Sequence, residues 1–532
     1  MELPTSMELE DSDSSVIHIE QIEIKKPESS LPKTETSKTQ VTRLNVLFLV
    51  SDDLRPQLES YKGIDYPNSG SKLNMYTPNL DRLAKKSLQM DKAYVQFSVC
   101  CPSRASYMTS RRPDTTQVWD LTTFWREAGG NFTTIPQYFK ERGYRTAGFG
   151  KIYHPGKGGG NNDVPMSWTE PYYHEPNGLF YQVINNSWWA VPEELSAAKP
   201  LHDEGITTAA IELLEELAPE ARYGKQPFFV AIGFQKPHIP FVFPERYLVH
   251  YPLMTVDLAP NPYAPVDFPT IAWFHIEGSN YDDIKATGKT GITLNETLPD
   301  DAAMLYRRAY FSCISFVDDM VGRLLKALDN LELTENTIVT FIGDHGFHLG
   351  ENGMWGKHTN MEQATHAPLM IHVPGRTSSG MRSKSIAEFV DLFPTIVEAA
   401  GLDPIPPCPE SSRDVHACTE GRSFVHLFGD SERAFKDFAF SQISRGTVMG
   451  YAVRDAHYRY VEWVPTSQNV VNDNECVRTL DWQHLVGREL YDHLTDPEEN
   501  KNIAEDNTYE DVVSRLKMAL RKIIKSRFEV KC

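Results

Sequence analysis

Two long apolar runs constrain the fold of this 532-residue chain most strongly. The first spans residues 45–50 and reads Asn-Val-Leu-Phe-Leu-Val; the second spans 337–342 and reads Thr-Ile-Val-Thr-Phe-Ile. Runs of strand length that are apolar on both faces are typical of strands buried in a mainly parallel sheet. Charged side chains follow both runs directly, namely Asp52, Asp53, Asp344 and His345. Since parallel strands deliver their carboxyl ends to one edge, we expect these side chains to gather there.

Helical and strand patterns alternate between the two runs. Apolar residues recur every three or four positions at 77–85 and 207–217, and another strand-like apolar run lies at 227–232. This alternation predicts an α/β protein with a large, mainly parallel central sheet flanked by helices. Residues 154–200 are rich in Gly, Asn, Pro and aromatic residues, so we expect long irregular surface loops there.

The sequence predicts three parts. Residues 1–44 are rich in Glu, Ser, Thr and Lys and lack an apolar stretch of about 7–15 residues that would form a signal-peptide core, so we expect a disordered polar tail. Residues 45–440 form the main domain. Residues 441–532 combine short strand patterns with an amphipathic helix near 509–527, which predicts a C-terminal α+β subdomain with a small antiparallel sheet and a terminal helix.

The net charge of −19 argues against a nucleic acid or an anionic membrane surface as a partner held by bulk electrostatics. The sequence contains no run of about 18 apolar residues, so we expect no membrane span. An anionic substrate would therefore have to be bound by a local group of cations.

Seven cysteines are too few for a disulfide scaffold in a chain of this length, and an odd number leaves at least one unpaired. Cys408 and Cys418 flank a short loop that a disulfide would close, contributing about 2–4 kcal/mol in an oxidising compartment. Two free surface thiols are the alternative. Acceptor sites for N-glycosylation at Asn131, Asn185 and Asn295 mildly favour secretion.

The most informative local sequence is Cys-Cys-Pro-Ser-Arg at residues 100–104. It fits the Cys-x-Pro-x-Arg signal by which the cysteine of a sulfatase is converted to formylglycine (3-oxoalanine). Cys100 has proline two places on and arginine four places on, whereas Cys101 does not. A pair of buried or metal-binding cysteines would be the simpler explanation if the motif stood alone.

Further motifs occur in the order expected for the sulfatase family, which the chain resembles over about residues 45–530. They are Gly-Lys-Ile-Tyr-His-Pro at 150–155, Lys-Pro-His-Ile-Pro at 236–240, and the segment from Asp344 to Lys357. Within the family, the chain is most similar to the iduronate-2-sulfatases. The resemblance implies an alkaline-phosphatase-like fold and makes residues 45–440 the sulfatase catalytic domain.

The resemblance also implies the catalytic roles. Cys100, as hydrated formylglycine, offers two hydroxyls on one carbon: one attacks sulfur and displaces the sugar alcohol, and the other later loses its proton and expels sulfate. Arg104 would orient the formylglycine oxygens, and Lys151 and Lys357 would bind the sulfate. His154 would hold the formylglycine hydroxyl and assist sulfate release. His238 would donate a proton to the leaving alcohol.

One Ca²⁺ ion is implied as the cofactor. Its ligands would be Asp52, Asp53, Asp344, His345 and Cys100 in its formylglycine form. Carboxylate oxygens suit a hard cation, whereas imidazole is an unusual calcium ligand. A single aspartate after a strand would more simply cap a turn or a helix, but two strand ends together with the cysteine motif favour a metal site.

The implied reaction is hydrolysis of sulfate esters in glycosaminoglycans, with the 2-sulfate of iduronate in heparan or dermatan sulfate as the expected target. The implied partners are a sulfated glycosaminoglycan oligosaccharide and the formylglycine-generating enzyme. The family works in lysosomes or outside cells, so a lysosomal or secreted location is expected.

Three departures bear on the choice of sugar. Ser110 replaces the family's usual glycine, which we expect to be tolerated unless that backbone requires a positive φ. Phe347 stands where iduronate-2-sulfatases have a tryptophan beside the sugar, and we expect its ring to retain stacking. Segment 170–200 lacks an expected cysteine pair. The alternatives are a sulfatase for a different sugar, an inactive relative that binds sulfated glycans, and a phosphohydrolase of the same superfamily.

Overall fold

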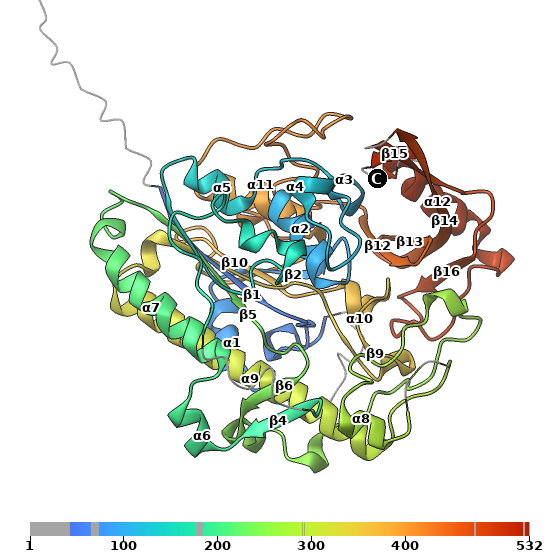
Figure 1. Cartoon of the computed structure of the whole chain (residues 1–532), viewed down its shortest axis with the longest axis horizontal. Helices are drawn as coiled ribbons and strands as arrows, with labels where there is room; N and C mark the ends of the chain where they lie inside the picture. The colour runs from blue at the N-terminus through green and yellow to red at the C-terminus, as the bar shows by residue number, and fades with distance from the viewer. Residues whose placement is uncertain are drawn as a thin grey trace, which may run out of the picture. The chain divides into compact units, whose positions relative to one another are not determined.

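The computed structural model describes residues 43–64, 74–176, 185–289, 291, 293–472, 475–524 and 527–530. Its centre is a seven-stranded sheet in the order β11-β2-β10-β7-β1-β5-β3 (Figure 1). The strands are β1 (Asn45–Ser51), β2 (Leu88–Tyr94), β3 (Arg145–Gly150), β5 (Phe228–Phe234), β7 (Thr337–Gly343), β10 (Leu369–His372) and β11 (Met381–Glu388). Within this described sheet only β10 runs antiparallel to its neighbours. The predicted mainly parallel sheet is confirmed.

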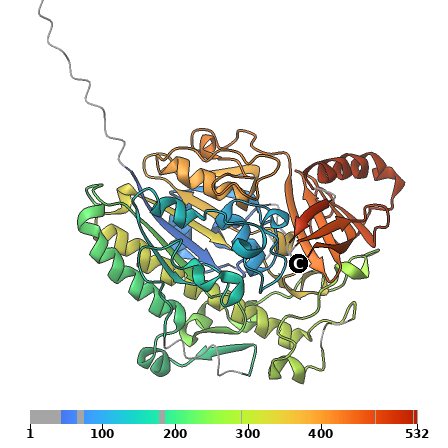
Figure 2. The same cartoon turned by 45° about the horizontal axis from the view of Figure 1, so that its top comes forward.

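Helices cover both faces of this sheet, as Figures 1 and 2 show. One face carries α1 (Pro78–Ala84), α7 (His202–Ala221) and α9 (Asp300–Asn330), and the other carries α2 (Cys100–Thr109), α5 (Ile135–Lys140) and α11 (Leu392–Ala399). Successive residues of β1 alternate between the two cores: Leu47 and Leu49 belong to the first, and Val46 and Phe48 to the second. Because a strand alternates its side chains, a run that is apolar at every position must be buried on both faces.

The register of β1 and β7 brings their polar ends together. The two strands pair in parallel from Asn45 opposite Thr337 to Ser51 opposite Gly343. The next residues along each strand, Asp52 and Asp344, therefore leave the sheet at the same edge. All residues of both strands are buried, which fixes this register because a one-residue shift would exchange the two cores.

The C-terminal part is a second, antiparallel sheet with one long helix, α12 (Glu510–Ile523), as predicted. Its strands are β12 (Ala439–Arg445), β13 (Val448–Arg454), β14 (Tyr458–Asn472), β15 (Glu475–Leu480), β16 (Gly487–Asp492) and β17 (Arg527–Val530). The helix is not the last element, because β17 follows it and pairs with β15. The boundaries after residues 44 and 440 remain predictions, and the predicted tail lies outside the described residues up to residue 42.

The expectation of irregular structure throughout 154–200 was partly wrong. This segment contains β4 (Trp188–Val191) and α6 (Glu193–Ala198). β4 pairs with β6 (Phe241–Pro244), some fifty residues further along the chain. The sequence of β4 alone gives no indication of this distant pairing partner. The shorter elements are α3 (Pro113–Thr116), α4 (Trp125–Ala128), α8 (Asp282–Ala286), α10 (Glu362–Thr365), β8 (His348–Leu349) and β9 (Trp355–Gly356).

Cys408 and Cys418 form the expected disulfide, with their Cα atoms 4.8 Å apart. Cys100, Cys101 and Cys313 are free and buried. Across the described helices, none combines the length and apolar character needed to cross a membrane.

Candidate active site

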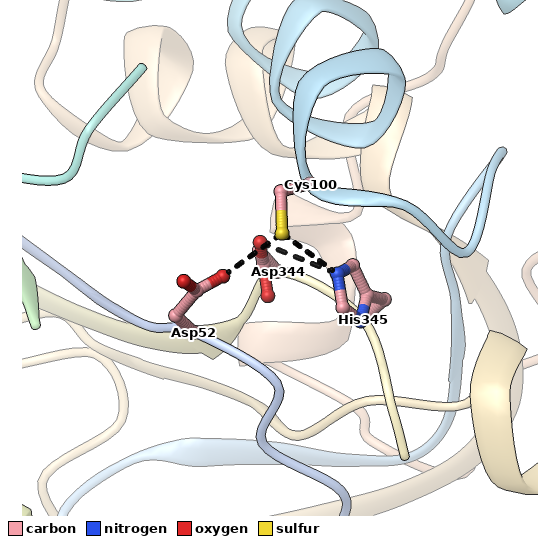
Figure 3. Close-up of side chains that lie close together, drawn as sticks. All are labelled: Asp52, Cys100, Asp344 and His345. Carbon is pink, nitrogen blue, oxygen red and sulfur yellow. Dashed lines mark hydrogen bonds and ion pairs between the residues drawn. The ribbon is translucent and has the colours of Figure 1, made fainter. Parts of the chain in front are cut away.

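Cys100 is the first residue of α2, and its side chain points to the edge where β1 and β7 end. Figure 3 shows it converging with Asp52, Asp344 and His345. The thiol Sγ lies 3.3 Å from Asp52 Oδ1 and 3.4 Å from His345 Nε2. Burial raises the pKa of the Cys100 thiol well above its usual range, and the charge of Asp52 raises it further.

Two lysines approach the same sulfur from separate elements. Lys151, directly after β3, places its Nζ 3.6 Å from Cys100 Sγ, and Lys357, directly after β9, places its Nζ 3.5 Å away. Lys151 pairs with Asp52, and Lys357 pairs with Asp53 at 2.5 Å. Burial opposes the charge on Lys151, but the neighbouring Asp52 and Cys100 together outweigh it and raise the pKa above the usual lysine range. Two fixed ammonium groups flanking one reactive position can hold a tetrahedral anion.

Arg104 binds two of the three buried aspartates from within α2. Its Nη2 lies 3.2 Å from Asp52 Oδ1, and its Nε lies 3.0 Å from Asp344 Oδ2. Burial opposes ionisation of Asp52, but Lys151, His238 and Arg104 outweigh it and hold the pKa of Asp52 well below its usual range. Arg104 therefore fixes both the position and the charge of these carboxylates.

The backbone at Asp53 adopts an uncommon conformation that turns its side chain toward the cluster. Asp53 has a φ of 61°. Its N–H donates to Asp344 Oδ1 at 2.9 Å, and its carbonyl accepts the Tyr310 hydroxyl at 2.7 Å. A left-handed aspartate costs on the order of 1 kcal/mol and persists where its surroundings fix it, most often at functional sites.

The donor set fits a hard divalent cation. Ligand atoms of Asp52, Cys100, Asp344 and His345 lie within 4.8 Å of one another, and those of Asp52, Asp53, Cys100 and His238 form a second such group. Asp53 Oδ2 is buried and accepts no hydrogen bond from the described residues. Burial raises the pKa values of Asp53 and Asp344 above the usual range, and a neighbouring carboxylate, Asp52, contributes to each. A cation among these oxygens would offset both effects.

His345 completes this set with one nitrogen. Its Nδ1 lies 2.9 Å from the carbonyl oxygen of Gly346, an arrangement that assigns the ring proton to Nδ1. Its Nε2 is left facing Asp53 Oδ1 at 3.5 Å and Asp344 Oδ2 at 3.6 Å. The other ring nitrogen is therefore directed at the carboxylates.

The other two candidate histidines, His238 and His154, contact the cluster around Cys100 less directly than His345 does. His238 follows β5 and places its Nε2 4.0 Å from Asp53 Oδ2; burial lowers its pKa well below the usual range, and Lys357 and Lys151 lower it further. His154 forms no hydrogen bond through Nδ1 with any described residue. Burial lowers the pKa of His154 to about 4, with Lys151 adding to the effect. The structure thus places His154 near Lys151 without joining it to the cluster by a hydrogen bond.

Two residues in this region escaped the sequence analysis. Glu277 lies in a loop, with its Oε1 3.4 Å from Lys357 Nζ. The ammonium of buried Lys236 donates to the carbonyl oxygens of His238 at 2.8 Å and Pro240 at 2.6 Å, bracing the loop that carries His238. The position of Lys236 inside the Lys-Pro-His-Ile-Pro motif could have pointed to it, whereas a single acidic loop residue gives no such signal.

The structure contradicts the expectation that Phe347 stacks on the sugar, and it answers whether position 110 requires a positive φ. Phe347 is fully buried and stacks on Tyr310 with ring centroids 5.6 Å apart, so its ring presents no face to a sugar. Ser110 has a φ of 54°, so the position does require the left-handed conformation. Its hydroxyl bonds to Val390 O at 2.5 Å and to Thr419 Oγ1 at 2.7 Å, which offsets the strain.

Comparison with known proteins agrees with this geometry. Residues 44–402 match the family described as Sulfatase, and residues 350–526 match the C-terminal region of N-sulphoglucosamine sulphohydrolase. Human iduronate 2-sulfatase is 36% identical over 89% of this chain and 94% of its own length, and the mouse protein is 35% identical over 88% and 92%. A sulfatase of Formosa agariphila is 28% identical over 91% of this chain and 87% of its own length.

Solved structures share the fold. The complex of BT4656 with its substrate D-glucosamine-2-N,6-O-disulfate has a TM-score of 0.67 at 20% identity and covers 90% of this chain and 97% of that one. The phosphonate monoester hydrolase of Agrobacterium radiobacter has a TM-score of 0.64 at 21% identity and covers 90% and 96%. These matches confirm the expected alkaline-phosphatase-like fold. The sequence relatives, which are sulfatases, indicate the reaction that this chain catalyses. The chain belongs to the sulfatase family and is a sulfuric ester hydrolase.

Proposed function

We propose that this protein is a sulfatase that removes sulfate esters from glycosaminoglycan sugars with Cys100 converted to formylglycine. The observation that carries the proposal is the setting of Cys100, whose sulfur lies 3.3–3.6 Å from one carboxylate, one imidazole and two ammonium groups. In its hydrated form, formylglycine supplies two geminal hydroxyls, one of which serves as the nucleophile. Conversion would require the formylglycine-generating enzyme as a partner.

The residues around Cys100 divide the remaining tasks. Lys151 and Lys357 bind the sulfate oxygens from two sides and neutralise the charge that develops during attack on sulfur. Arg104 orients the nucleophile by holding the neighbouring carboxylates in place. His238 donates a proton to the departing sugar oxygen, and His154 removes a proton when sulfate is released.

We also propose that Asp52, Asp53, Asp344 and His345, with the modified Cys100, hold one Ca²⁺ ion. The ion would supply positive charge for the sulfate and for the oxygen nucleophile. Two features support this assignment: Asp53 Oδ2 accepts no hydrogen bond from the described residues, and three buried carboxylates lie close together. A lysosomal or secreted location fits the disulfide and the exposed side chains of Asn131, Asn185 and Asn295.

The 2-sulfate of iduronate in heparan or dermatan sulfate is the proposed target, since the chain is 36% identical to human iduronate 2-sulfatase. The buried ring of Phe347 leaves a different sulfated sugar as the alternative, because the sugar would lack an aromatic contact at that position. Defined heparan and dermatan disaccharides, each offered to the purified enzyme, distinguish these substrates by which sulfate is lost. Loss of a glucosamine sulfate alone would overturn the iduronate assignment.

Mass analysis tests the nucleophile. Protein from a host that contains the formylglycine-generating enzyme should yield a peptide carrying formylglycine at Cys100, together with sulfatase activity. Cys100→Ala should abolish both. Cys101→Ser is the matched control, because it changes the neighbouring buried thiol while preserving the Cys-x-Pro-x-Arg signal, and it should retain both. An unmodified Cys100 in fully active protein would refute the proposal.

A further inference from the structure

A group of aromatic and basic side chains beside Lys357 has no role in the chemistry above. The ring of Phe274 stacks on His358, with centroids 4.3 Å apart and planes 20° apart, and lies 4.3 Å from the ring of His275. The guanidinium of Arg445 lies 5.4 Å from the centroid of Phe274. We call Phe274, His275, His358 and Arg445 the rim cluster. It joins two loops of the catalytic part to the end of β12 in the C-terminal sheet.

The rim cluster adjoins the active site through His358. This residue follows Lys357 directly, and its N–H donates to the carbonyl oxygen of Ser98 at 3.2 Å, two residues before Cys100. Burial lowers the pKa of His358 well below its usual range, and the charges of Lys357 and Arg445 lower it further. The imidazole is therefore close to the sulfate-binding lysine and to the arginine of the rim cluster.

Arg445 carries a charge that no described carboxylate neutralises by a direct ion pair. Its Nη atoms donate to the carbonyl oxygens of Ser444, at 3.1 Å, and His358, and its buried Nε has no partner among the described residues. Arg445 is half-buried, with its Nε fully enclosed, and this chain has an excess of acidic residues that could have paired with it. Burial lowers the pKa of Arg445 to about 10, so the guanidinium remains charged at neutral pH.

Arg445 contacts aromatic faces and forms no direct ion pair with a described carboxylate; Glu489 acts on it only through its charge. Its guanidinium lies 5.4 Å from Phe274 and 5.7 Å from Trp463, distances at which cation–π attraction operates. Such contacts orient the side chain without pairing its charge with an acid. A planar guanidinium also matches two oxygens of a carboxylate or a sulfate in parallel hydrogen bonds.

We propose that Arg445, held by the rim cluster, binds a second anionic group of the sulfated sugar while Lys151 and Lys357 bind the sulfate to be removed. The inference rests on the proposed function and extends it from one anion to two. The second anion is either a carboxylate on the same ring or a sulfate on the neighbouring ring. This subsite selects polyanionic glycans over singly charged sulfate esters.

Three sulfated substrates test the subsite. They are a sulfated uronic acid monosaccharide, its carboxyl-reduced form, and a carboxyl-reduced disaccharide with a further sulfate on the neighbouring ring. The wild-type enzyme should show a higher kcat/KM for at least one doubly charged substrate than for the carboxyl-reduced monosaccharide. Arg445→Gln should lower that preference by about tenfold to a hundredfold, and Arg445→Lys by less, because lysine keeps the charge but not the two parallel bonds.

Arg376→Gln is the matched control. Arg376 also lies over a phenylalanine, Phe428 at 4.9 Å, and donates to the backbone carbonyl of Val425, but it follows β10, whose end lies at the opposite edge of the sheet. It should retain the wild-type preference. If Arg445→Gln loses the preference only for the uronic acid, the second anion is the carboxylate. If it loses the preference only for the disaccharide, the second anion is the sulfate on the neighbouring ring.

If Arg445→Gln lowers kcat/KM equally on all three substrates, the proposed subsite is wrong. Arg445 would then only stabilise the loop that carries His358. Wild-type enzyme without preference between charged and reduced sugars would overturn it as well. Absence of any sulfate ester turnover would refute the proposed function instead. In that case, calorimetric binding of the same sugars to Cys100→Ala protein, with and without Arg445→Gln, still decides whether Arg445 contacts the second anion.

Discussion

Ser110 ends α2 in a left-handed conformation that a glycine would adopt without strain. Its two hydrogen bonds, to Val390 and Thr419, offset that strain. Ser110→Ala keeps the strain and removes both bonds, so we expect its free energy of unfolding to fall by about 1–3 kcal/mol. Ser110→Gly relieves the strain and should lose less. Denaturant unfolding of the two variants checks this order, and an alanine variant as stable as wild type would contradict it.

Glu489 gives the protein a pH-dependent stability away from the active site. Burial raises its pKa to about 7, although Trp463 Nε1 and the Tyr491 hydroxyl donate to it. The folded protein therefore holds this proton more tightly than the unfolded chain. The resulting stability is present below about pH 4.5 and is lost as the pH rises through 7. Glu489→Gln cannot ionise, so from pH 5 to pH 8 it should gain roughly 3 kcal/mol relative to wild type in denaturant unfolding; parallel pH curves would contradict this.

The sequence could predict those site residues that belong to short motifs. Cys100, Lys151, His238 and Lys357 each lie in such a segment, and the residue types alone indicate anion and metal chemistry. Glu277 and Arg445 could not be predicted, because each is a single charged residue that becomes informative only when tertiary folding brings it near Lys357. The burial of Phe347 likewise depends on its packing against Tyr310, which lies on a distant helix.

At the scale of elements, the burial of α2 predicts that the proposed modification of Cys100 must precede folding. Every residue from Cys100 to Thr109 is buried in the folded protein. An enzyme that reads the Cys-x-Pro-x-Arg signal needs this segment extended and accessible. We therefore expect the formylglycine-generating enzyme to convert Cys100 in an unfolded peptide covering this segment and to leave folded, unmodified protein unchanged. Mass analysis after incubation measures both, and equal conversion would contradict the expectation.

Elements whose pattern is local were predictable, and those that depend on a distant partner were not. β1 and β7 carry apolar residues on both faces, so their burial in a parallel sheet follows from the sequence. β4 is recognisable only through its pairing with β6, and β17 through its pairing with β15. Strand propensity depends on these cross-strand neighbours, which a single segment does not reveal.

At the scale of the whole molecule, buried charges join the C-terminal sheet to the catalytic part. Arg459 in β14 pairs with Glu362 in α10 and, at 2.5 Å, with Glu499. Arg459 Nη1 also donates to the carbonyl oxygen of Asn360 at 2.7 Å, three residues after Lys357. The second sheet thus supports the loop that carries Lys357, the lysine proposed to bind sulfate.

Removing Arg459 should therefore destabilise the molecule far more than removing a surface arginine of the same sheet. Arg459→Met leaves two buried carboxylates partly uncompensated, because Glu362 retains Arg454 and Glu499 retains His493. We therefore expect its free energy of unfolding to fall by up to about 3–5 kcal/mol at pH 7. Arg488→Met removes an exposed pair with Glu505 and should change it by less than about 1 kcal/mol. Burial opposes the charge of Glu499, but Arg459 and His493 together lower its pKa to about 2. The stability from this carboxylate is therefore present above about pH 4.5 and is lost as the pH falls toward 2. The deficit of Arg459→Met relative to wild type should accordingly narrow on acidification, because protonation removes the uncompensated charges. Denaturant unfolding of both variants from pH 7 to pH 4 measures this, and equal, pH-independent losses would show that the ion pairs do not hold the two sheets together.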